Sequence, residues 1–526
     1  MARTPLFARL SSEIERARAA LPGSVATGPR AISRRAALAM MAAAAACSPE
    51  QKGSTEHDPD AIAIVGSGVS GLVTAWRLAN AGRSCEIFEA SGRTGGRMYT
   101  LRDFTPEGHF CDLGGEFIAP VHAALITLCR ELGVGLQDLR ADGEVETDIY
   151  DITGVRLAED LIDPATGAGG FAPVAARIAA DQAALLDSAG AWTDRARDLD
   201  ALPLSDYLES LSGSTERWVI DILALAYLCE HGIAPEKQSS LNLVDAIGTD
   251  TARPFNMFGH GDGLMRIKGG SESLPESLTA RLMASAVSDR ASIHLRHTLS
   301  SIEREGDAYR LTFENEGKPP VIHTFKRAVL TLPFTRLRAV KGLGGLGLPA
   351  DKMKVINEQG YGANAKLMVG TSSRPWTNAL PGIDAPMTGS LYSDRGFQQM
   401  WDSSIGQPGD GGVLTNYLAG APARSEESTV LATLERGLKA LSPELASSLS
   451  PRMRASFFWA NHPHTRGSYS GALAGQYTSF PEVAARSELG GGLVFAGEHT
   501  GMEWAGSMNG AVHAGERAAR ELLAQT

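Results

Sequence analysis

Gly66, Gly68 and Gly71 have the spacing of a loop that binds the pyrophosphate of a dinucleotide. In such a loop Gly66 permits a tight turn, Gly68 lets the backbone approach the phosphates, and Gly71 lets the following helix pack closely. Glu89 follows Gly71 by 18 residues, where an acidic side chain can accept hydrogen bonds from ribose hydroxyls. These residue types and spacings predict chemistry that depends on a bound dinucleotide.

The segments around these residues have the pattern of a strand, a helix and a second strand. Residues 61–65 form a continuous apolar run, as expected for a strand that is buried on both faces. Residues 72–81 have helical apolar spacing, and Gly82 follows as a stop signal. A second strand over residues 85–88 ends directly before Glu89. The order predicts a Rossmann-like unit in which the helix N-terminus faces the pyrophosphate.

The composition is that of an ordinary globular protein of roughly two to four domains. Of its 526 residues, 43% are hydrophobic and 21% are charged. There are 49 basic and 60 acidic side chains, for a net charge of −11, and no basic run, so nucleic acid is not expected as a partner. The five cysteines lie far apart without zinc-ligand spacing, so neither a metal site nor a disulfide framework is expected.

The N-terminal residues 1–47 resemble a twin-arginine export signal. Arg34 and Arg35 precede the apolar run 36–47, which is shorter than the roughly 20 residues of a membrane-spanning helix. A disordered arm is the alternative. Export to the periplasm or the medium is expected, with a lipid anchor at Cys47 as an option and residues 48–59 as a polar linker.

The residues after Glu89 indicate which dinucleotide is bound. Residues 89–97 (EASGRTGGR) combine paired glycines, which permit close backbone approach, with arginines, which neutralise phosphate. This stretch resembles the second motif of the flavin-dependent amine oxidase family, and residues 112–118 (DLGGEFI) resemble the family's next element. The resemblance implies FAD rather than NAD. The FAD-contacting residues that it implies here are Arg93, Gly96, Arg97, Gly114 and Gly115.

The resemblance extends over nearly all of the chain from Ala61 to the C-terminus. Residues 269–302 are similar to the segment that returns the family's chain to the FAD domain, and residues 328–333 to the strand that closes it. Residues 492–511 are the most specific match, and there a helix N-terminus would face the flavin N1/O2 edge. The contacts implied in these segments are Leu299, beside the adenine, and Gly497, Glu498 and Met508.

The order of segments predicts an α/β protein with a discontinuous, Rossmann-like FAD-binding domain and an inserted α+β substrate-binding domain. Helical spacing in one insertion, and short strands with several aromatics in the other, indicate the second domain. The active site is expected between the two domains. The predicted FAD-binding domain comprises residues 60–130, 256–345 and 486–526, and the predicted substrate-binding domain comprises residues 131–255 and 346–485.

Lys366 interrupts an apolar strand over residues 363–369. Such a lysine either extends to solvent or is held in a site by a partner, and the residues alone leave both interpretations open. It matches the family lysine that hydrogen-bonds a water bridging to flavin N5. The resemblance implies that Lys366 orients this water and supplies positive charge during the reaction with oxygen.

Residues 462–470 (HPHTRGSYS) resemble a family segment in which Tyr469 forms one wall of an aromatic cage facing the flavin; a core tyrosine is the alternative. Ser468 stands where covalent-flavin relatives have cysteine, which implies non-covalent FAD. Ser507 stands where most relatives carry the second aromatic wall, so Trp504, three residues earlier, is the candidate for that surface. The two histidines of the segment have no third ligand nearby, and no metal is expected.

Together these residues predict an FAD-dependent amine oxidase that takes hydride from the α-carbon of a neutral amine to flavin N5, after which the imine hydrolyses. Residues 114–118, 240–243, 467–470 and 475–478 are most similar to bacterial L-amino-acid oxidases, so an L-amino acid is the first expectation. Phe117 occupies the position of the substrate-binding arginine of well-known members, so the group that would bind a carboxylate is not identified.

Three alternatives remain open. Monoamine or polyamine oxidation is the first, a desaturase-like or porphyrinogen-oxidase-like flavoprotein acting on lipophilic substrates is the second, and a flavin-binding module without turnover is the third. The expected partners are a small amine or amino acid and oxygen or another electron acceptor. No transmembrane span is expected, and the sequence leaves open whether two copies form a homodimer.

Overall fold

The computed structural model describes residues 60–139, 148–157, 170–249, 257–258, 265–284, 287–381, 383 and 385–525. Its contacts divide the chain into two compact units. One comprises Met1–Asp58 and Leu186–Ala191, and only the latter segment, which contains a turn, is described. The other comprises Pro59–Leu185 and Trp192–Thr526 and holds every element described below.

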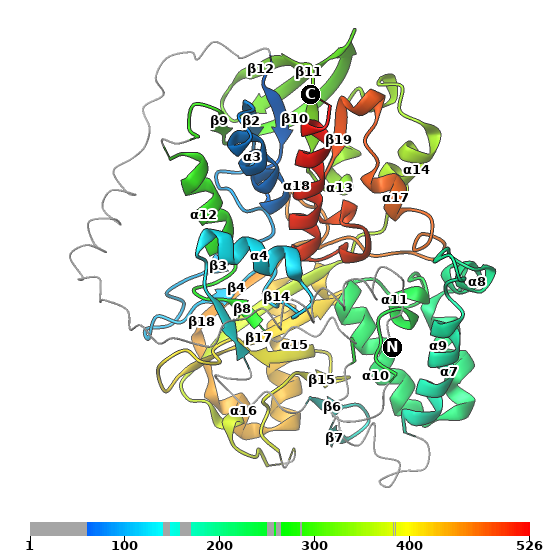
Figure 1. Cartoon of the computed structure of the whole chain (residues 1–526). Coiled ribbons are helices and arrows are strands. Elements are labelled where there is room, and N and C mark those ends of the chain that lie inside the picture. Colours follow the sequence, from blue (N-terminus) through cyan, green and yellow to red (C-terminus); the bar gives the residue numbers. More distant parts are fainter. Residues whose placement is uncertain are drawn as a thin grey trace, which may run out of the picture. The chain divides into compact units, whose positions relative to one another are not determined.

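A five-stranded parallel sheet forms the centre of the predicted FAD-binding domain, with the strand order β19-β13-β1-β2-β9 (Figure 1). In β1, Ile62 and Ile64 pack into the core on one face, and Ala63 and Val65 into the core on the other. Burial on both faces explains why this strand is a continuous apolar run. The strands are β1 (Ile62–Val65), β2 (Cys85–Phe88), β9 (Ala291–His294), β13 (Ala328–Leu330) and β19 (Leu493–Phe495).

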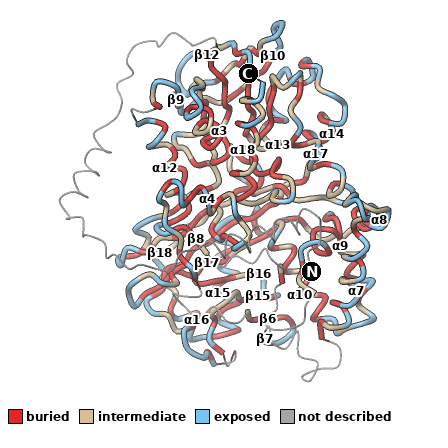
Figure 2. Tube along the Cα trace, viewed as in Figure 1, coloured by how far each residue is buried: buried red, intermediate tan, exposed pale blue. Residues whose placement is uncertain are grey.

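Helices cover the face of this sheet on which Ile62 and Ile64 pack, and Figure 1 shows α3 (blue) and α18 (red) side by side. Their backbones come very close, because a Cβ on Gly515 of α18 would lie 2.5 Å from the Ser70 carbonyl oxygen of α3. Figure 2 shows long buried stretches in both helices. The helices are α3 (Val69–Asn80), α4 (Ala123–Leu132), α12 (Ser273–Leu282) and α18 (Met508–Leu523).

An antiparallel sheet of three strands, together with short helices, covers the opposite face. Two of these helices, α14 and α17, belong to a segment that the sequence assigns to the substrate-binding domain, yet Val355 and Ala484 pack in the same core as β13 and β19. The predicted domain boundaries stay a prediction. The elements are β10 (His297–Glu305), β11 (Ala308–Asn315), β12 (Lys318–Phe325), α13 (Phe334–Leu337), η3 (Leu343–Gly345), α14 (Ala350–Glu358), α17 (Pro481–Ala485) and η6 (Leu489–Gly491).

A second large sheet has seven strands in the order β18-β14-β17-β16-β15-β6-β7. Its neighbours are antiparallel except for the parallel pair β15 and β6. Aliphatic residues of one face pack with α15 and α16. The elements are β6 (Ile149–Asp151), β7 (Val155–Leu157), β14 (Asn364–Thr371), β15 (Leu391–Ser393), β16 (Gln398–Asp402), β17 (Gly412–Ala419), β18 (Leu449–Phe458), α15 (Glu427–Leu441), α16 (Pro443–Ser448), η4 (Pro375–Thr377) and η5 (Pro422–Arg424).

A group of helices and two small ribbons complete the second unit. The longest of these helices, α10, contacts β15, β16 and β17 of the seven-stranded sheet. The elements are α7 (Ala172–Ala183), α8 (Asp194–Ala201), α9 (Leu204–Leu211), η1 (Ser212–Ser214), α10 (Arg217–His231), α11 (Leu241–Val244), the ribbon β3 (Thr100–Leu101) with β4 (Cys111–Asp112), the ribbon β5 (Leu136–Asp138) with β8 (Met265–Ile267), and the short turns η7 (Glu498–Thr500) and η8 (Met502–Trp504).

The parallel sheet with its glycine loop, and the inserted mixed sheet with helices, confirm the predicted α/β class with a Rossmann-like unit. The predicted export signal, linker and Cys47 lie outside the described residues. Within the described ranges, every helix is too short or too polar to cross a membrane.

Candidate active site

The glycine loop joins β1 to α3 and leaves space beside the first turn of the helix. Gly66 has a φ of +106°, a conformation that favours glycine, and a Cβ on Gly71 would lie 2.0 Å from the Gly66 carbonyl oxygen. A Cβ on Gly96 would lie 3.2 Å from the Gly68 Cα. By contrast, a Cβ on Gly68 would meet no atom within 4 Å, and no side chain caps α3. Uncapped N–H groups beside open space are what a pyrophosphate requires.

Glu89 lies at the end of β2 and holds the glycine loop in place. Its Oε2 accepts hydrogen bonds from the backbone N–H and the hydroxyl of Ser67, both at 2.8 Å. Its Oε1 accepts the Ser91 N–H at 2.8 Å. A carboxylate offers about four acceptor positions, so a ribose hydroxyl can still bind beside these three donors.

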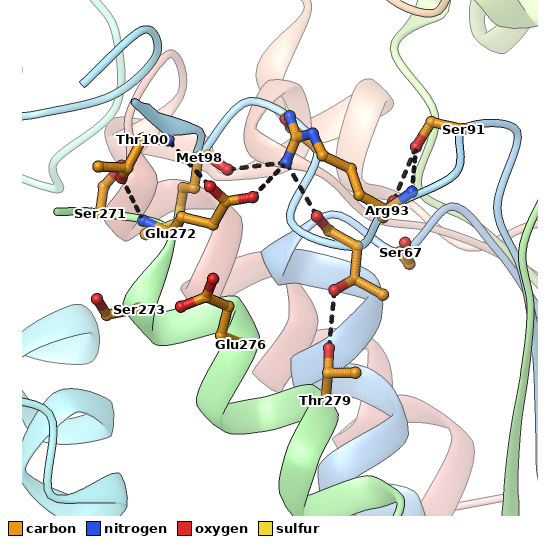
Figure 3. A network of polar contacts seen from close by, with 12 residues as sticks. Ser67, Ser91, Arg93, Met98, Thr100, Ser271, Glu272, Ser273, Glu276 and Thr279 are labelled. Carbon is orange, nitrogen blue, oxygen red and sulfur yellow. Dashed lines mark hydrogen bonds and ion pairs between the residues drawn. The ribbon is translucent and has the colours of Figure 1, made fainter. Parts of the chain in front are cut away.

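The Arg93 guanidinium is engaged within the protein, as Figure 3 shows. It lies 3.8 Å from the centroid of the Tyr99 ring and donates to the Met98 carbonyl and to Glu272, both at 3.2 Å. These contacts shape the loop over residues 94–98. The expected FAD contact of Arg93 stays a prediction.

Arg97 and Glu498 join two motifs that are 401 residues apart in the sequence. Arg97 donates to Glu498 Oε1 at 2.6 Å and to the Ser468 carbonyl at 2.9 Å. Glu498 Oε2 accepts the Ser470 hydroxyl at 2.7 Å and the Gly506 N–H at 2.8 Å. Burial acts to raise the pKa of Glu498, but Arg97 and its other partners outweigh burial and hold the pKa below the usual value. The ionised carboxylate therefore fixes three segments around one point.

Close contacts also fix Gly114, Gly115 and Gly497. A Cβ on Gly114 would lie 1.9 Å from the Arg97 carbonyl oxygen, and a Cβ on Gly115 would lie 2.9 Å from Met508 Sδ at the start of α18. Gly497 has a φ of +107° and donates its N–H to the Ser70 hydroxyl at 2.9 Å.

Leu299 lies in β10 of the three-stranded sheet. Between Leu299 and Ser301 the register with β11 shifts, which marks a bulge in the ladder. A bulge leaves backbone groups out of the regular pairing, as the expected contact with the adenine requires.

Lys366 is buried, with 5% of its surface exposed, and does not extend to solvent. Its ammonium donates to Glu116 Oε2 at 2.8 Å and to the Asp112 carbonyl at 2.9 Å, and lies 5.2 Å from the centroid of the Trp401 ring. An ammonium has three N–H donors, and the third has no partner among the described residues. That donor is available to a water molecule, as the resemblance implies.

Two carboxyl groups surround Lys366. Glu116 also accepts the Ser403 hydroxyl at 3.2 Å. Asp112 accepts the Thr100 hydroxyl at 2.6 Å through Oδ1, while its Oδ2 is buried without a partner. Burial, with the Glu116 carboxylate as the next cause, raises the pKa of Asp112 to about 6. The charge of Lys366 is therefore largely balanced by Glu116.

Lys366 belongs to a polar and aromatic surface of the seven-stranded sheet. Neighbouring strands place Lys366 opposite Tyr417, Tyr417 opposite Gln399, and Gln399 opposite Tyr392. Trp401 lies two residues from Gln399 and therefore on the same face. We call these five residues the aromatic face. Helix α10 contacts the strands that carry it.

Tyr469 completes the aromatic face from a separate loop. Its hydroxyl lies 3.0 Å from the Tyr417 hydroxyl and donates to the Glu230 carbonyl oxygen at the end of α10. A Cβ on Gly506 would lie 3.5 Å from its ring. Tyr469 thus lies where loop, sheet and helix meet.

Trp504, the predicted second wall of the aromatic cage, contacts a different residue from Tyr469. The Trp504 ring meets the His122 ring edge-on at 5.8 Å, and no ring contact joins Trp504 to Tyr469 among the described residues. Ser507 is the N-cap of α18, where its hydroxyl accepts the Gly510 N–H at 2.9 Å and donates to the Trp504 carbonyl. The cage role of Trp504 stays a prediction, and Ser507 has a backbone role that the sequence comparison did not suggest.

Sequence reasoning assigned no role to four residues of this site. Glu116 could have been noticed, because it directly follows the paired glycines of the DLGGE segment. Trp401, Tyr417 and Glu230 come from segments without motifs. Strand register brings Trp401 and Tyr417 to Lys366, and the end of α10 brings the Glu230 carbonyl to Tyr469.

These features fit a flavin dinucleotide: uncapped helix donors beside an open Gly68, the acidic residue Glu89 at the end of β2, and the close approach of Gly115 to Met508 at the start of α18. The Ser468 hydroxyl donates to Asn364 at 2.6 Å. Within the described ranges, no group of three His, Cys, Asp or Glu could hold a metal ion.

Known proteins similar to this chain include an L-amino acid dehydrogenase and a flavin-containing amine oxidase. The L-amino acid dehydrogenase of Synechocystis sp. is 25% identical over 490 residues, which cover 88% of this chain and 94% of that protein. Amine oxidase [flavin-containing] B of Rattus norvegicus is 24% identical over 492 residues, with coverage of 88% and 86%.

Solved structures show the same fold. Cyclohexylamine oxidase from Brevibacterium oxydans superposes with a TM-score of 0.72 at 20% identity, covering 89% of this chain and 99% of that one. Wild-type putrescine oxidase bound to putrescine superposes with a TM-score of 0.69 at 20% identity, covering 88% and 99%. The sequence model described as "Flavin containing amine oxidoreductase" matches residues 69–523. The chain therefore belongs to the flavin-containing amine oxidoreductase family, as predicted.

Proposed function

We propose that the protein is an FAD-dependent oxidase of amines, with L-amino acids as the first substrate class. The products would be an imine, which hydrolyses to a keto acid and ammonia, and hydrogen peroxide from oxygen. The observation that carries the proposal is Lys366, an ammonium buried beside the converged glycine motifs with one N–H donor left over. A lysine that served only solubility would extend to solvent.

FAD would be held by the loop of Gly66, Gly68 and Gly71, by Glu89 at the ribose, and by the segments that Glu498 ties together. When bound, it supplies the acceptor for the hydride of the amine α-carbon. Non-covalent binding is supported by Ser468, whose hydroxyl cannot form a thioether.

The chain's own residues would orient the substrate and a water molecule. Lys366 would hold the water through its third N–H and keep a positive charge at the reacting end. Tyr469 and Tyr417, joined at their hydroxyls, would steer the nitrogen of an approaching amine with their ring faces. No protein nucleophile is needed for this reaction.

L-amino acids are placed first because the chain spans nearly the whole of the Synechocystis L-amino acid dehydrogenase. Oxidation of monoamines or polyamines is the second candidate, supported by the similarity to amine oxidase B. We propose oxygen as the electron acceptor.

Anaerobic mixing of purified holoprotein with a panel of L-amino acids, monoamines and polyamines tests the proposal. We expect an L-amino acid to bleach the flavin absorbance near 450 nm, and admission of air to restore it with release of peroxide. Acid precipitation should release intact FAD into the supernatant. A flavin that no amine bleaches would contradict amine oxidation. Flavin left in the pellet would contradict non-covalent binding.

We also propose that the chain is exported by the twin-arginine route, on the basis of Arg34 and Arg35 before the apolar run. Replacing both arginines by lysine should retain the protein in the cytoplasm, as measured by cell fractionation. A periplasmic protein in that variant would contradict the route. Replacing Cys47 by serine tests the lipid anchor, since an anchored protein would leave the membrane fraction.

A further inference from the structure

Glu230 lies at the aromatic face but takes no part in the chemistry proposed above. It is the penultimate residue of α10, and its carbonyl oxygen accepts the hydroxyl of Tyr469. The Glu230 carboxylate is also among the charges that act on the phenols of Tyr392, Tyr417 and Tyr469. With α10 packed on the strands that carry the aromatic face, Glu230 lies beside the same face as Lys366.

The Glu230 carboxylate is both accessible and desolvated. The residue is exposed, yet burial raises its pKa to about 6. The hydrogen bond from Tyr469 and the packing of α10 on the sheet place this exposed residue beside the aromatic face, where a small cation can reach its side chain. The raised pKa agrees with a carboxylate that has lost part of its hydration.

The position is an unfavourable one for a negative charge. Glu230 is in the last turn of a helix of 15 residues, where the helix dipole is negative. The neighbouring His231 does not offset the charge, because burial lowers its pKa to about 4 and it is neutral at pH 7. Among the described residues, no hydrogen bond or ion pair is made by the Glu230 carboxylate. A desolvated carboxylate without a partner is costly unless a cation binds to it.

We propose that Glu230 binds a second cationic group of the substrate, remote from the amine that is oxidised. The proposal rests on the proposed amine oxidation and narrows its substrate class to amines with two positive charges. An L-amino acid with a cationic side chain and a linear diamine both have this chemistry. Glu230 is thus a specificity-determining residue.

Glu230 suits the remote group and not the reacting one. Hydride leaves the α-carbon of a neutral amine, whereas a carboxylate stabilises the protonated form of an amine. The reacting end would lie at Lys366, whose charge Glu116 balances. Tyr417 lies opposite Lys366 and its hydroxyl is joined to that of Tyr469, which bonds to the Glu230 carbonyl, so the two phenols connect Lys366 with Glu230. Phenol rings attract cations through their faces.

Matched substrates with and without the remote charge test the proposal. The pairs are L-lysine with L-norleucine, and 1,5-diaminopentane with pentylamine. For the holoprotein we expect kcat/KM to be about tenfold or more higher for the dication of the effective pair, the usual size of one charge-assisted contact. The first pair tests whether the substrate is a basic amino acid, and the second tests whether it is a diamine.

Glu230→Gln should remove this preference, mostly through KM, and leave the singly charged partner within about threefold of the wild-type value. Glu230→Asp keeps the charge and should retain part of the preference. The matched control is Glu236→Gln, which removes an exposed carboxylate six residues away and should change neither substrate. Equal rates for both members of each pair in the wild type, or a preference that survives in Glu230→Gln, would overturn the proposal.

Binding separates this proposal from the proposed function. If no amine bleaches the flavin, oxidation is wrong, but the perturbation of the flavin spectrum by 1,5-diaminopentane still reports binding at Glu230. Weaker binding in Glu230→Gln than in Glu236→Gln would then support the cation site. Equal binding in the two variants would refute it.

Discussion

The dinucleotide end and the aromatic face of the site are built in different ways. At the dinucleotide end, Gly66, Gly71 and Gly114 bring backbone atoms so close that a Cβ on Gly71 or Gly114 would lie within about 2 Å of a carbonyl oxygen. On the aromatic face, Lys366, Tyr417 and their neighbours come from four strands and are aligned by register. One region depends on the absence of side chains, and the other on their identity.

This difference explains how each region tolerates change. A glycine whose Cβ would lie about 2 Å from a carbonyl oxygen allows no other residue, so the dinucleotide end requires glycine at Gly71 and Gly114. The aromatic face needs residues of suitable size and polarity, and the same strands can carry others without loss of the sheet. We therefore expect the dinucleotide end to tolerate fewer substitutions than the aromatic face.

The largest effect is expected at Gly68, where a substitution should affect FAD binding without affecting folding. Gly68→Val should fold, because the φ of −61° suits any residue and the added atoms meet no protein atom at the Cβ. It should bind FAD at least about 100-fold more weakly, because the side chain fills the pyrophosphate space. Thermal melting and the flavin released by acid measure the two properties.

Gly71→Val is the matched comparison. Its Cβ would lie 2.0 Å from the Gly66 carbonyl oxygen, so the variant should lose soluble protein as well as flavin. A Gly68→Val protein with a full content of FAD would show that the open space beside α3 does not hold the pyrophosphate.

Most of the dinucleotide end could be predicted from the sequence, because its residues are close together in short motifs. The βαβ unit around Gly66 and the acidic residue Glu89 follow from spacing alone. What the motifs did not show is the use of Arg93 within its own loop, since a guanidinium binds carbonyl oxygens as readily as phosphate.

The aromatic face was predicted only in part. Lys366 and Tyr469 were found by resemblance, but Trp401, Tyr417 and Glu230 depend on strand register and on where α10 ends. Register is a property of paired strands far apart in the chain, so no local pattern indicates it.

The next effect concerns Lys366. Lys366→Met should retain FAD and slow flavin reoxidation by oxygen about tenfold or more, because it removes a charge and a water ligand from the reacting end. Stopped-flow measurement of reoxidation, with anaerobic reduction measured separately, checks this. Lys354→Met, which changes an exposed lysine of α14, is the control. Unchanged reoxidation in Lys366→Met would assign the lysine a structural role beside Glu116.

A smaller effect is expected at Ser507, where the capping role and the predicted pocket role can be separated. Ser507→Ala should destabilise the protein by about 1 kcal/mol through the lost cap of α18, and Ser507→Thr should restore most of it. Ser507→Tyr should in addition lower kcat/KM for the bulkiest good substrate about tenfold while sparing small ones, if the ring narrows the pocket. Equal kinetics in the Ala and Tyr variants would leave Ser507 with the capping role alone.

The smallest effect concerns folding stability, which the ionised Glu230 carboxylate should lower. Its carboxyl pKa in the folded protein is raised by burial to about 6 from 4.5, so the folded state holds the proton more tightly and stability falls as pH rises through this window. Asp148 also lies near Tyr392, and burial raises its pKa to about 6 as well. Tyr417 and Tyr469 have raised pKa values and stay neutral throughout.

Glu230→Gln should therefore melt at a higher temperature than the wild type at pH 7.5, and at nearly the same temperature at pH 4.5. The gain should be at most about 1 kcal/mol, because the accessible carboxylate keeps part of its hydration. Differential scanning fluorimetry at both pH values measures it, with Asp148→Asn as the comparison for the second buried carboxyl. A variant that is less stable than the wild type at pH 7.5 would mean that a cation of the protein already pairs with Glu230, and that the aromatic face, like the dinucleotide end, holds its charges for structure.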